Sequence, residues 1–527
     1  MGNYFNPDND RFQMAVNNDI YVDKSELIQI TNSRLNKGDK RFIYVSRPRR
    51  FGKSTALNML CAYYSKGCRS EAIFNQLAIS QSENYQKYLN RFNVIYADMQ
   101  KFLRLSRNNI DKMLDIFAER VIKEISNAYS EFETDETDLP SYLEQFYCRY
   151  HAQFIILIDE WDCVFRTVKG DEAAKKYYLD YLSSLLKEQP YVALAYVTGI
   201  LPIKQYGNNS VLNMFDDSIM TQPYDFAPYI GLTSEEVKSL CEKYRVSFDM
   251  MKSWYDGYKL KSFEMYCPRS VISAIEKQEF KSYWTQTETY EALSGYIAMD
   301  FDGLHSTLEN ILAGQKVFID PYTFANDMFH FQDKDDILTL LVHLGYLGYD
   351  SDTKEVFIPN KEIADEFVRS MRKTGLWKET INAVVKSRQL LTDTLNGEVQ
   401  KVAAAIEEVH ENVPILSYNN EQSLRFVILL AYYYAREQYN IFQEMPSGDG
   451  YADIVFLPKP NIGLSDYLPL VIELKWNQSA ETAIRQIKNR KYIKALSGFD
   501  KALLVGINYD KNTKKHECMI EEQVIKE

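Results

Sequence analysis

A short polar segment, Arg47-Pro-Arg-Arg-Phe-Gly-Lys-Ser-Thr55, constrains the fold more than any other feature of the chain. It follows Arg41-Phe-Ile-Tyr-Val-Ser46, a β-branched and aromatic run that is typical of a buried strand. It leads into residues 54–64, where apolar residues recur on one side of a predicted helix. A strand, a polar loop and a helix in this order predict an α/β fold for the N-terminal part.

Three further apolar runs predict more strands of the same sheet, at residues 92–98, 154–158 and 191–197. Helical patterns lie between them, including residues 109–130 and 172–187. Because the run from 154 to 158 is almost continuously apolar, both of its faces are expected to be covered. Strands that alternate with helices at this spacing predict a doubly wound parallel sheet.

The residues Gly52, Lys53, Ser54 and Thr55 form the end of a pattern that binds nucleotide phosphates. Such a loop turns backbone N–H groups toward the phosphates at the start of a helix, where the helix dipole also favours anions. In this interpretation Lys53 neutralises the β- and γ-phosphate oxygens and Ser54 holds Mg²⁺. Thr55 is expected to lie beside the α-phosphate.

An acid pair, Asp159-Glu160, closes the predicted strand at residues 154–158. In P-loop ATPases such a pair brings one carboxylate to the Mg²⁺-bound water and lets the other polarise the attacking water. Thr198 follows the next predicted strand and is expected to reach the γ-phosphate. The alternative for Asp159 is that it caps the following helix.

Six segments together carry a family resemblance: Tyr21-Val-Asp-Lys24, Ser46-Arg-Pro-Arg-Arg-Phe-Gly-Lys-Ser54, Asp159-Glu-Trp-Asp162, Thr198-Gly-Ile200, Tyr255-Asp-Gly-Tyr258 and Tyr283-Trp284. With them the chain resembles the AAA-ATPase-like proteins of bacteria over almost its whole length. That family typically joins the ATPase to a C-terminal PD-(D/E)XK nuclease-like domain, which implies ATP and Mg²⁺ as cofactors. The generic phosphate-binding pattern has glycine where this chain has Arg47, but Arg47 agrees with the family's own loop. Arg49 and Arg50 are expected to supply charge at the nucleotide, with loop solubility as the alternative.

Near the C-terminus, Asp453 begins one predicted strand, and Glu473-Leu-Lys475 ends the next one at residues 470–475. Because side chains alternate along a strand, Val471, Glu473 and Lys475 are expected on one face of the sheet. PD-(D/E)XK enzymes use such carboxylates to hold Mg²⁺ and such a lysine to orient or deprotonate the attacking water. The alternative is a nuclease-like fold that binds without cutting.

Two flanking residues extend this predicted site. Gln486 follows the catalytic strands on a predicted helix and matches a frequent glutamine of the fold, although a surface helix residue is the alternative. Glu421 precedes the apolar helix at 424–435, where the family carries an acid that supports the metal. A basic cluster predicts contact with nucleic acid, with a solvated helix face as the alternative. It consists of Arg485, Lys488, Arg490, Lys491 and Lys494.

The middle of the chain has a different character. A capped helix start at Thr233-Ser-Glu-Glu236 opens a stretch that is predicted to be largely helical through about residue 286. A predicted helix at 335–344 and a hairpin at 347–358 resemble a winged-helix module, and residues 379–411 are predicted to be helical.

Four domains are therefore predicted. They are a P-loop AAA-like ATPase core (1–230), a helical lid (231–290), a helical and winged-helix-like linker region (291–400) and an α/β PD-(D/E)XK nuclease-like domain (401–527).

Composition excludes several other classes of protein. None of the seven cysteines forms a CxxC pair and the six histidines are scattered, which argues against zinc sites, disulfide frameworks and histidine-based hydrolysis. The first ten residues are polar, and no apolar run approaches the ~20 residues of a membrane span. A cytoplasmic protein with no membrane segment is expected, and its net charge of −12 makes the local basic cluster important for any nucleic-acid contact.

The predicted function is ATP binding and hydrolysis coupled to a Mg²⁺-dependent nuclease that acts on DNA. One alternative is an ATP-driven switch that binds nucleic acid or protein with an inactive nuclease-like domain, and another is an ATP-dependent sensor that acts on proteins. Arg166 and Arg269 are the candidates for an arginine finger. A homo-oligomer, the form of the nucleic acid and the cleavage specificity are left open.

Overall fold

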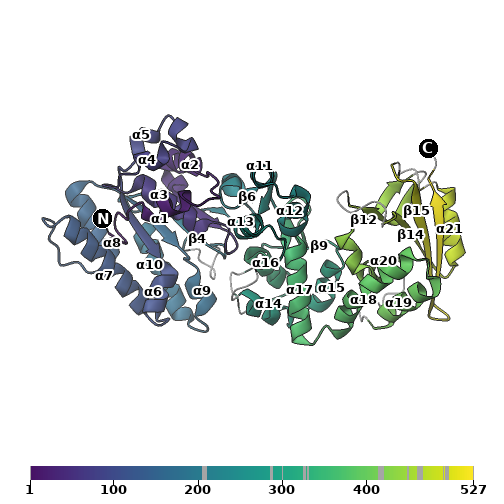
Figure 1. Ribbon diagram of the computed structural model, residues 1–527. Coiled ribbons are helices and arrows are strands. Elements are labelled where there is room, and N and C mark those ends of the chain that lie inside the picture. The colour runs from purple at the N-terminus through teal and green to yellow at the C-terminus, as the bar shows by residue number, and fades with distance from the viewer. Residues whose placement is uncertain are drawn as a thin grey trace. The chain divides into compact units, whose positions relative to one another are not determined.

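The computed structural model describes residues 2–203, 211–284, 289–299, 301–324, 328, 331–412, 421–447, 450–459, 467–490, 492, 496 and 498–525. The chain forms two compact units (Figure 1). Unit 1 comprises Met1–Thr287 and Phe318–Ile363, and unit 2 comprises Glu288–Val317 and Ala364–Glu527. The chain therefore leaves unit 1 at two points, after residue 287 and after residue 363.

Unit 1 is built on a five-stranded parallel sheet with the strand order β2-β3-β4-β1-β5. The strands are β1 (Phe42–Ser46), β2 (Asn93–Asp98), β3 (Phe154–Asp159), β4 (Val192–Gly199) and β5 (Asp216–Ser218). Strands β1 to β4 confirm the four predicted strands to within two residues at each end. The surrounding helices are α1 (Asp10–Val16), α2 (Leu27–Arg34), α3 (Lys53–Tyr64), α4 (Glu71–Phe74), α5 (Tyr85–Tyr88), α6 (Met99–Leu105), α7 (Ile110–Ala128), α8 (Leu139–Tyr150), α9 (Cys163–Thr167) and α10 (Glu172–Leu186), with the 3₁₀ helices η1 (Gly38–Arg41), η2 (Ala78–Gln81) and η3 (Tyr224–Tyr229).

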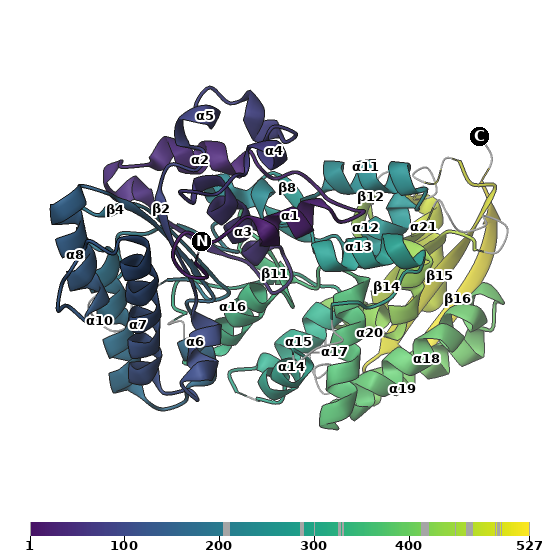
Figure 2. The same ribbon diagram turned by 60° about the vertical axis from the view of Figure 1, so that its left-hand side comes forward.

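The sheet is covered on both faces, as the apolar strands require. From β1 the chain passes through α3 to β2 at the edge, and then returns across the sheet through β3 to β4. Because parallel crossovers are right-handed, connections that run in opposite directions place their helices on opposite faces. Figure 2 shows α3 on one side of the strands and α7, α8 and α10 on the other.

The remainder of unit 1 combines small sheets with helices. Its elements are β6 (Leu232–Thr233), α11 (Ser234–Tyr244), α12 (Phe248–Tyr255), β7 (Tyr258–Leu260), β8 (Phe263–Tyr266), α13 (Pro268–Lys277), α16 (Lys334–Leu344), β10 (Gly348–Asp350) and β11 (Glu355–Phe357). The predicted helix start is confirmed, because Thr233 and Glu236 form a complete capping box at α11. The predicted hairpin at 347–358 is confirmed by β10 and β11.

The prediction of a largely helical stretch through residue 286 is wrong for residues 258–266, which form the antiparallel β7–β8 hairpin. The turn depends on Lys261, whose φ of +55° lies in the left-handed region that a helix cannot use. Tyr258 and Leu260 on one strand and Met265 on the other are buried, so burial of this apolar set outweighs local helix propensity.

Unit 2 contains a mixed five-stranded sheet, in which β14 and β15 are parallel and the other neighbours are antiparallel. The strands are β12 (Tyr439–Ser447), β13 (Gly450–Pro458), β14 (Leu470–Trp476), β15 (Lys501–Asp510) and β16 (Lys515–Val524). The helices are α14 (Thr289–Ile297), α15 (Leu304–Leu312), α18 (Lys378–Leu395), α19 (Val399–Asn412), α20 (Glu421–Ala431) and α21 (Ala480–Asn489), with the 3₁₀ helix η5 (Tyr433–Glu437). Helix α17 (Lys361–Thr374) starts in unit 1 and ends in unit 2, whereas β9 (Val317–Phe318) starts in unit 2 and ends in unit 1.

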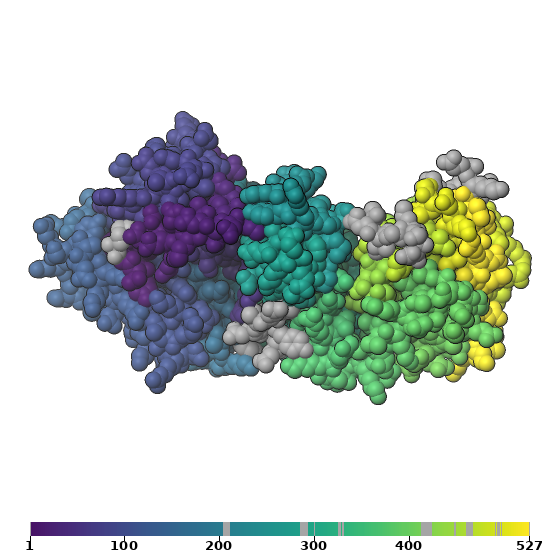
Figure 3. Space-filling model, in the orientation of Figure 1, coloured from purple at the N-terminus to yellow at the C-terminus, as the bar shows by residue number. Residues whose placement is uncertain are grey.

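The two faces of the unit 2 sheet bury different residues of β14. Leu470, Ile472 and Leu474 belong to one apolar cluster, which also contains residues of α18, α19 and α20. Val471 belongs to the other cluster, with Ile484 and Ile487 of α21. This division confirms that odd-numbered residues of β14 face α21. Figure 3 shows the green helices α18 and α19 on the outer surface of unit 2.

No helix in the described ranges is both long enough and apolar enough to cross a membrane. Helices α18 and α19 confirm the helical prediction for residues 379–411. The division of the chain into four domains stays a prediction.

Candidate functional site

The Arg47–Gly52 loop connects β1 to α3 at the carboxyl end of the sheet. Two of its residues adopt left-handed backbone angles, with φ of +69° at Arg50 and +96° at Gly52. Left-handed residues turn neighbouring N–H groups toward a common point, which is the geometry of an anion-binding loop. A Cβ at Gly52 would meet no atom within 4 Å, so open space adjoins the loop where α3 begins.

Arg47 does not face this space. Its guanidinium is fully buried and donates to the backbone oxygens of Ser46 (2.7 Å) and Ser218 (3.0 Å). Burial lowers the pKa of Arg47 to about 10. The residue that replaces the expected glycine therefore anchors the loop to β5 and leaves ligand binding to other residues.

Lys53 is buried at the start of α3, and its Nζ donates to the carbonyl oxygens of Arg47 (2.9 Å) and Pro48 (3.0 Å). Burial lowers its pKa, and the nearby Glu160 and Asp159 oppose this shift. Ser54 and Thr55 follow on the exposed side of the helix. The predicted phosphate ligands are thus together, with the lysine folded back on the loop carbonyls.

Asp159 links three elements of the predicted site. Its carboxylate accepts hydrogen bonds from Ser54 Oγ (2.6 Å), from Thr198 Oγ1 (2.5 Å) and from the Glu160 backbone N–H (3.0 Å). Burial raises the pKa of Asp159, while its hydrogen bonds to Ser54 and Thr198 counteract the rise. The structure therefore brings Ser54, Asp159 and Thr198 together at the carboxyl edge of β3 and β4.

Glu160 is held by a residue that sequence reasoning considered only as an arginine finger. Arg166 of α9 forms ion pairs with Glu160 and with Asp162, and its side chain is 7% exposed. Burial tends to raise the pKa of Glu160, but Arg166, Lys53 and Arg49 outweigh it and lower the pKa. Glu160 is therefore ionised at neutral pH, and Arg166 is its ion-pair partner within the same chain.

Asp162 fixes the turn after β4. Its Oδ2 accepts from the backbone N–H groups of Ile200 (2.9 Å) and Leu201 (2.8 Å). Gly199 is required there, because a Cβ would lie 2.6 Å from the Trp161 ring. Of the other predicted arginines, Arg49 lies close enough to Glu160 to affect its pKa, and Arg269 is exposed in the first turn of α13.

In unit 2 the predicted carboxylates meet across β13 and β14. The pairing of Ile454 with Ile472 places Asp453 opposite Glu473 at the end of this ladder. Asp453 Oδ2 accepts from the Leu474 backbone N–H (2.8 Å), so the carboxylate is oriented by the neighbouring strand.

Glu473 is the centre of this cluster. Its Oε1 accepts from Lys475 Nζ (3.0 Å) and from Gln486 Nε2, while its buried Oε2 has no hydrogen-bond partner in the described part of the chain. Burial and then the charge of Asp453 raise the pKa of Glu473 to about 7. The structure thus brings Asp453, Glu473, Lys475 and Gln486 together.

Close packing of α21 on the sheet places Gln486. Gly506 of β15 is paired with Glu473, and a Cβ at Gly506 would lie 2.3 Å from the Ala480 carbonyl oxygen at the start of α21. Only glycine allows this approach. The helix therefore lies near enough for Gln486 to reach Glu473.

Sequence reasoning missed Arg425 of α20. Its guanidinium donates to Asp453 Oδ1 (3.2 Å) and to Glu444 Oε1 (2.6 Å), so it covers the carboxylate oxygen that the backbone leaves available. No spacing signal in the sequence points to Arg425, because both of its partners lie on other elements. Glu421 is the first residue of α20, but its side chain lies outside the described residues.

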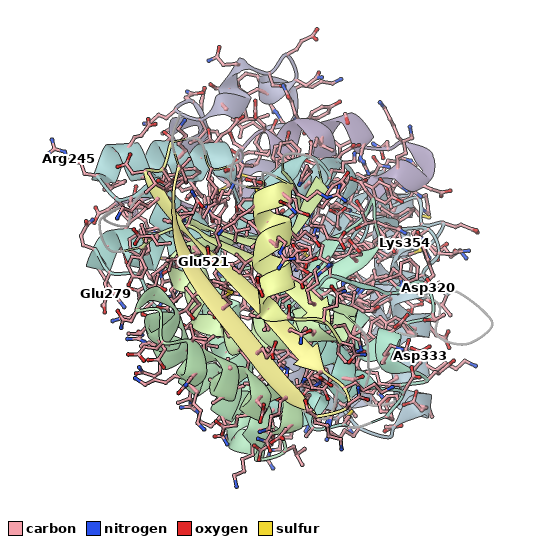
Figure 4. All side chains as sticks on the ribbon, turned by 90° about the vertical axis from the view of Figure 1, so that its right-hand side faces the viewer. Arg245, Glu279, Asp320, Asp333, Lys354 and Glu521 are labelled. Carbon is pink, nitrogen blue, oxygen red and sulfur yellow. The ribbon has the colours of Figure 1, made fainter. Side chains whose placement is uncertain are left out.

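The predicted basic cluster is partly neutralised by acidic neighbours. Arg485 pairs with Glu481 (2.9 Å) on α21, and Lys488 pairs with Glu521 on β16. Figure 4 shows α21 lying across the sheet, with Glu521 on the neighbouring strand. Arg490 follows the helix, whereas Lys491 and Lys494 lie outside the described residues.

No group of three or more histidine, cysteine, aspartate or glutamate side chains that could hold a metal occurs among the residues the structure describes. Within this described part of the chain, each candidate site therefore offers fewer than three such side chains as ligands for a metal ion. Ser54 and Asp159 provide oxygen donors in unit 1, and Asp453 and Glu473 provide them in unit 2.

Comparison with known proteins supports an ATPase-like N-terminal part. Residues 10–207 match the family model described as predicted AAA-ATPase. A protein of Azotobacter chroococcum mcd 1, described as an uncharacterized protein in the vnfD 5′ region, is 21% identical over 252 residues. The match covers 47% of each chain, so this chain spans about half of that relative.

Two solved structures show weak overall similarity. PCH-2 of C. elegans is 12% identical with a TM-score of 0.20, covering 45% of this chain and 48% of its own. Cdc6p of Pyrobaculum aerophilum is 12% identical with a TM-score of 0.25, covering 66% of this chain and 92% of its own. From the family match and the parallel sheet with its loop, the N-terminal part of this chain carries an AAA-ATPase-like domain.

Proposed function

We propose that the chain hydrolyses ATP in unit 1 and that the nucleotide state licenses Mg²⁺-dependent cleavage of DNA by a PD-(D/E)XK-like site in unit 2. The observation that carries the nuclease proposal is the juxtaposition of Asp453 and Glu473, with Lys475 and Gln486 on the same carboxylate. The ATPase proposal is supported by the Ser54–Asp159–Thr198 cluster within the segment that matches the family model.

Both sites suit Mg²⁺, which prefers hard oxygen ligands. In unit 2 the fit has a further basis, because Glu473 Oε2 is buried without a hydrogen-bond partner in the described structure. A buried carboxylate oxygen in that state costs free energy that a cation offsets. When bound, Mg²⁺ would activate water for attack on phosphorus and stabilise the charge that develops there.

The residues of unit 1 have distinct tasks in this proposal. Lys53 exchanges the carbonyl oxygens of Arg47 and Pro48 for phosphate oxygens when nucleotide enters. Ionised Glu160 accepts a proton from the attacking water, and Arg166 sets the direction of its carboxylate. Thr198 orients Asp159 from the neighbouring strand.

The residues of unit 2 position a phosphodiester and a water. The Leu474 N–H orients the Asp453 carboxylate, and Gln486 orients the Glu473 carboxylate. In this proposal the two carboxylates, on paired strands, bind the same Mg²⁺ ion. Lys475 lies beside Glu473, where its ammonium orients the water or neutralises charge on the phosphate.

The ATPase proposal is tested with Lys53→Ala and Glu160→Gln in the full chain. Lys53→Ala is expected to weaken ATP binding at least tenfold, about 1.4 kcal/mol. Glu160→Gln is expected to retain binding and lower the hydrolysis rate by roughly 100-fold, the usual contribution of a general base. Exposed Lys176→Ala on α10 is the control. Unchanged hydrolysis in both site variants would refute the proposal.

The nuclease proposal is tested by Mg²⁺-dependent cleavage of single- and double-stranded DNA. Asp453→Ala and Lys475→Ala are each expected to abolish cleavage, and Lys401→Ala on the exposed side of α19 is expected to cut like the wild type. Cleavage that persists in both site variants would place the activity elsewhere or in a contaminant.

A second candidate function is an ATP-driven switch that binds nucleic acid or protein without cutting. The ion pairs of Arg485 with Glu481 and of Lys488 with Glu521 favour it, because they reduce the positive charge available to phosphates. This function is supported if the wild type hydrolyses ATP but cuts neither DNA nor RNA.

A further inference from the structure

The two points where the chain leaves unit 1 are marked by buried polar contacts. Trp284 lies three residues before the first exit, after residue 287, and Glu362 lies one residue before the second, after residue 363. Trp284 and Glu362 are each 2% exposed. The roles assigned above to the ATPase and nuclease residues involve neither of them.

Glu362 ties the two exits to each other. Its Oε1 accepts from the backbone N–H groups of Tyr283 (2.5 Å) and Trp284 (2.7 Å), and its Oε2 accepts from Ser270 Oγ (2.7 Å) on α13. A buried carboxylate is costly unless it is hydrogen-bonded in this way, and removal of the carboxylate leaves buried donors unpaired. The start of α17 and the segment at 283–284 are therefore fixed to one another.

Trp284 ties the same segment to the Arg47–Gly52 loop. Its indole N–H donates to the Arg49 carbonyl oxygen (3.2 Å), and its ring packs on Tyr346 with centroids 5.2 Å apart. A Cβ at Gly345 would lie 2.8 Å from Pro48 Cβ and 3.4 Å from the Trp284 ring. The loop is therefore closely packed against Trp284 and Gly345.

The carbonyl that Trp284 holds is next to those that Lys53 holds. Lys53 Nζ bonds to the oxygens of Arg47 and Pro48, and Trp284 Nε1 bonds to the oxygen of Arg49. When Lys53 turns to a phosphate, two of these three successive carbonyls lose their donor and the loop must adjust. A close-packed neighbour cannot absorb such a shift without moving, so the adjustment reaches Trp284.

We propose that Trp284 and Glu362 are positioning residues that transmit the nucleotide state of the Arg47–Gly52 loop to two of the three chain connections between the units, those after residues 287 and 363. This regulation rests on the proposed function, because nucleotide must bind at the loop. The path is Arg49 carbonyl, Trp284 indole, Trp284 backbone, Glu362 carboxylate and the start of α17.

The test is hydrogen exchange of the full-length protein with and without a non-hydrolysable ATP analogue and Mg²⁺. In the wild type, exchange is expected to change at residues 281–284 and 361–374 as well as at the loop. Trp284→Phe keeps a ring but loses the indole N–H, a hydrogen bond of about 1 kcal/mol. It is expected to retain nucleotide affinity within roughly fivefold, the equivalent of that hydrogen bond. Its nucleotide-dependent change at 361–374 is expected to disappear.

Two comparisons separate transmission from general destabilisation. Trp377→Phe makes the same substitution at a buried tryptophan whose Nε1 has no hydrogen-bond partner among the described residues, and it is expected to respond to nucleotide like the wild type. Glu362→Ala is expected to lose the response at 361–374, whereas Glu362→Gln keeps an acceptor for both backbone N–H groups and restores it.

The outcomes distinguish this inference from the proposed function. If the wild type binds no nucleotide, the proposed function fails and the inference fails with it. If nucleotide binds and the exchange at 361–374 does not change, or changes equally in Trp284→Phe, only the transmission is overturned.

Discussion

Glu473 shows how burial and a neighbouring charge change the pKa of a single carboxyl group. Its pKa is raised to about 7, first by burial and then by Asp453, whereas its ordinary value is 4.5. Between these values the unfolded chain releases a proton that the folded chain retains. Folding stability therefore falls as pH rises through this window and is constant with respect to Glu473 above it.

Glu473→Gln is expected to remove this pH dependence. At pH 8 the variant should be more stable relative to the wild type than it is at pH 4.5, by an amount on the order of 1–3 kcal/mol. Chemical denaturation of both proteins in metal-free buffer from pH 4.5 to 8 measures the difference. Wild-type and variant stabilities that run parallel over this range would show that Glu473 is not the titrating group.

Arg425 competes for the carboxylate that faces the proposed metal. The side chains of Arg425 and Asp453 are 16% and 15% exposed, so solvent partly screens the ion pair between them. Arg425→Gln is expected to tighten Mn²⁺ binding about two- to fivefold, since a partly solvent-accessible pair contributes up to about 1 kcal/mol. Titration calorimetry measures the affinity, with Arg485→Gln on α21 as the control. Weaker binding in Arg425→Gln would show that the guanidinium supports the site.

At the scale of elements, the position of α21 depends on the absence of one side chain. Gly506→Ala places a Cβ against the Ala480 carbonyl oxygen, so α21 must move away from β15. Overpacking of this kind costs about 1–3 kcal/mol. Because the shift separates Gln486 from Glu473, metal affinity is expected to fall together with stability.

Thermal unfolding and Mn²⁺ titration of Gly506→Ala measure both effects. Gly295→Ala in α14 is the matched control, since a Cβ there meets no atom within 4 Å and alanine favours a helix. If Gly506→Ala bound metal as tightly as the wild type, the contact of Gln486 with Glu473 would not contribute to metal binding.

At the scale of the molecule, the two compact units are expected to unfold in separate steps. Saturation with nucleotide at about 100 times its Kd stabilises the unit that binds it by about 2.7 kcal/mol. Differential scanning calorimetry is therefore expected to show that an ATP analogue with Mg²⁺ raises the temperature of one unfolding transition. In Lys53→Ala this increase is expected to be absent. A single transition that shifts as a whole would show that the units unfold cooperatively.

Four of the five strands of the unit 1 sheet were predictable for local reasons, whereas only β13 and β14 of the five unit 2 strands were predicted. Strands β1 to β4 are continuous apolar runs, and the Thr233–Glu236 capping box is a four-residue pattern. The β7–β8 hairpin was missed because its turn uses Lys261 at positive φ, and lysine gives no signal of that conformation. Its pairing is decided by burial against the rest of unit 1.

The motif residues of the candidate sites could be predicted from the sequence. The residues that hold them in position could be predicted less well. Lys53, Ser54 and Asp159 were recognised from motifs, and the side-chain alternation of β14 placed Glu473 beside Lys475. The partners that restrain them were not recognised. Arg425 pairs with Glu444 and Asp453 on other elements, and no spacing rule identifies such pairs. The pair of Arg166 with Asp162 has i,i+4 spacing and could have been identified from it.

By itself the amino-acid sequence determined where strands β1 to β4, β13 and β14 and several helices form and which chemical groups stand at their ends, because burial periodicity and backbone motifs act over a few residues. Only the tertiary structure decided that Arg47 is an anchor, that the basic cluster is partly paired with acids and that Glu362 joins the two exits from unit 1. These outcomes depend on charges and donors that meet across distant segments. These interactions contribute to stability only after packing has excluded water from the polar groups involved.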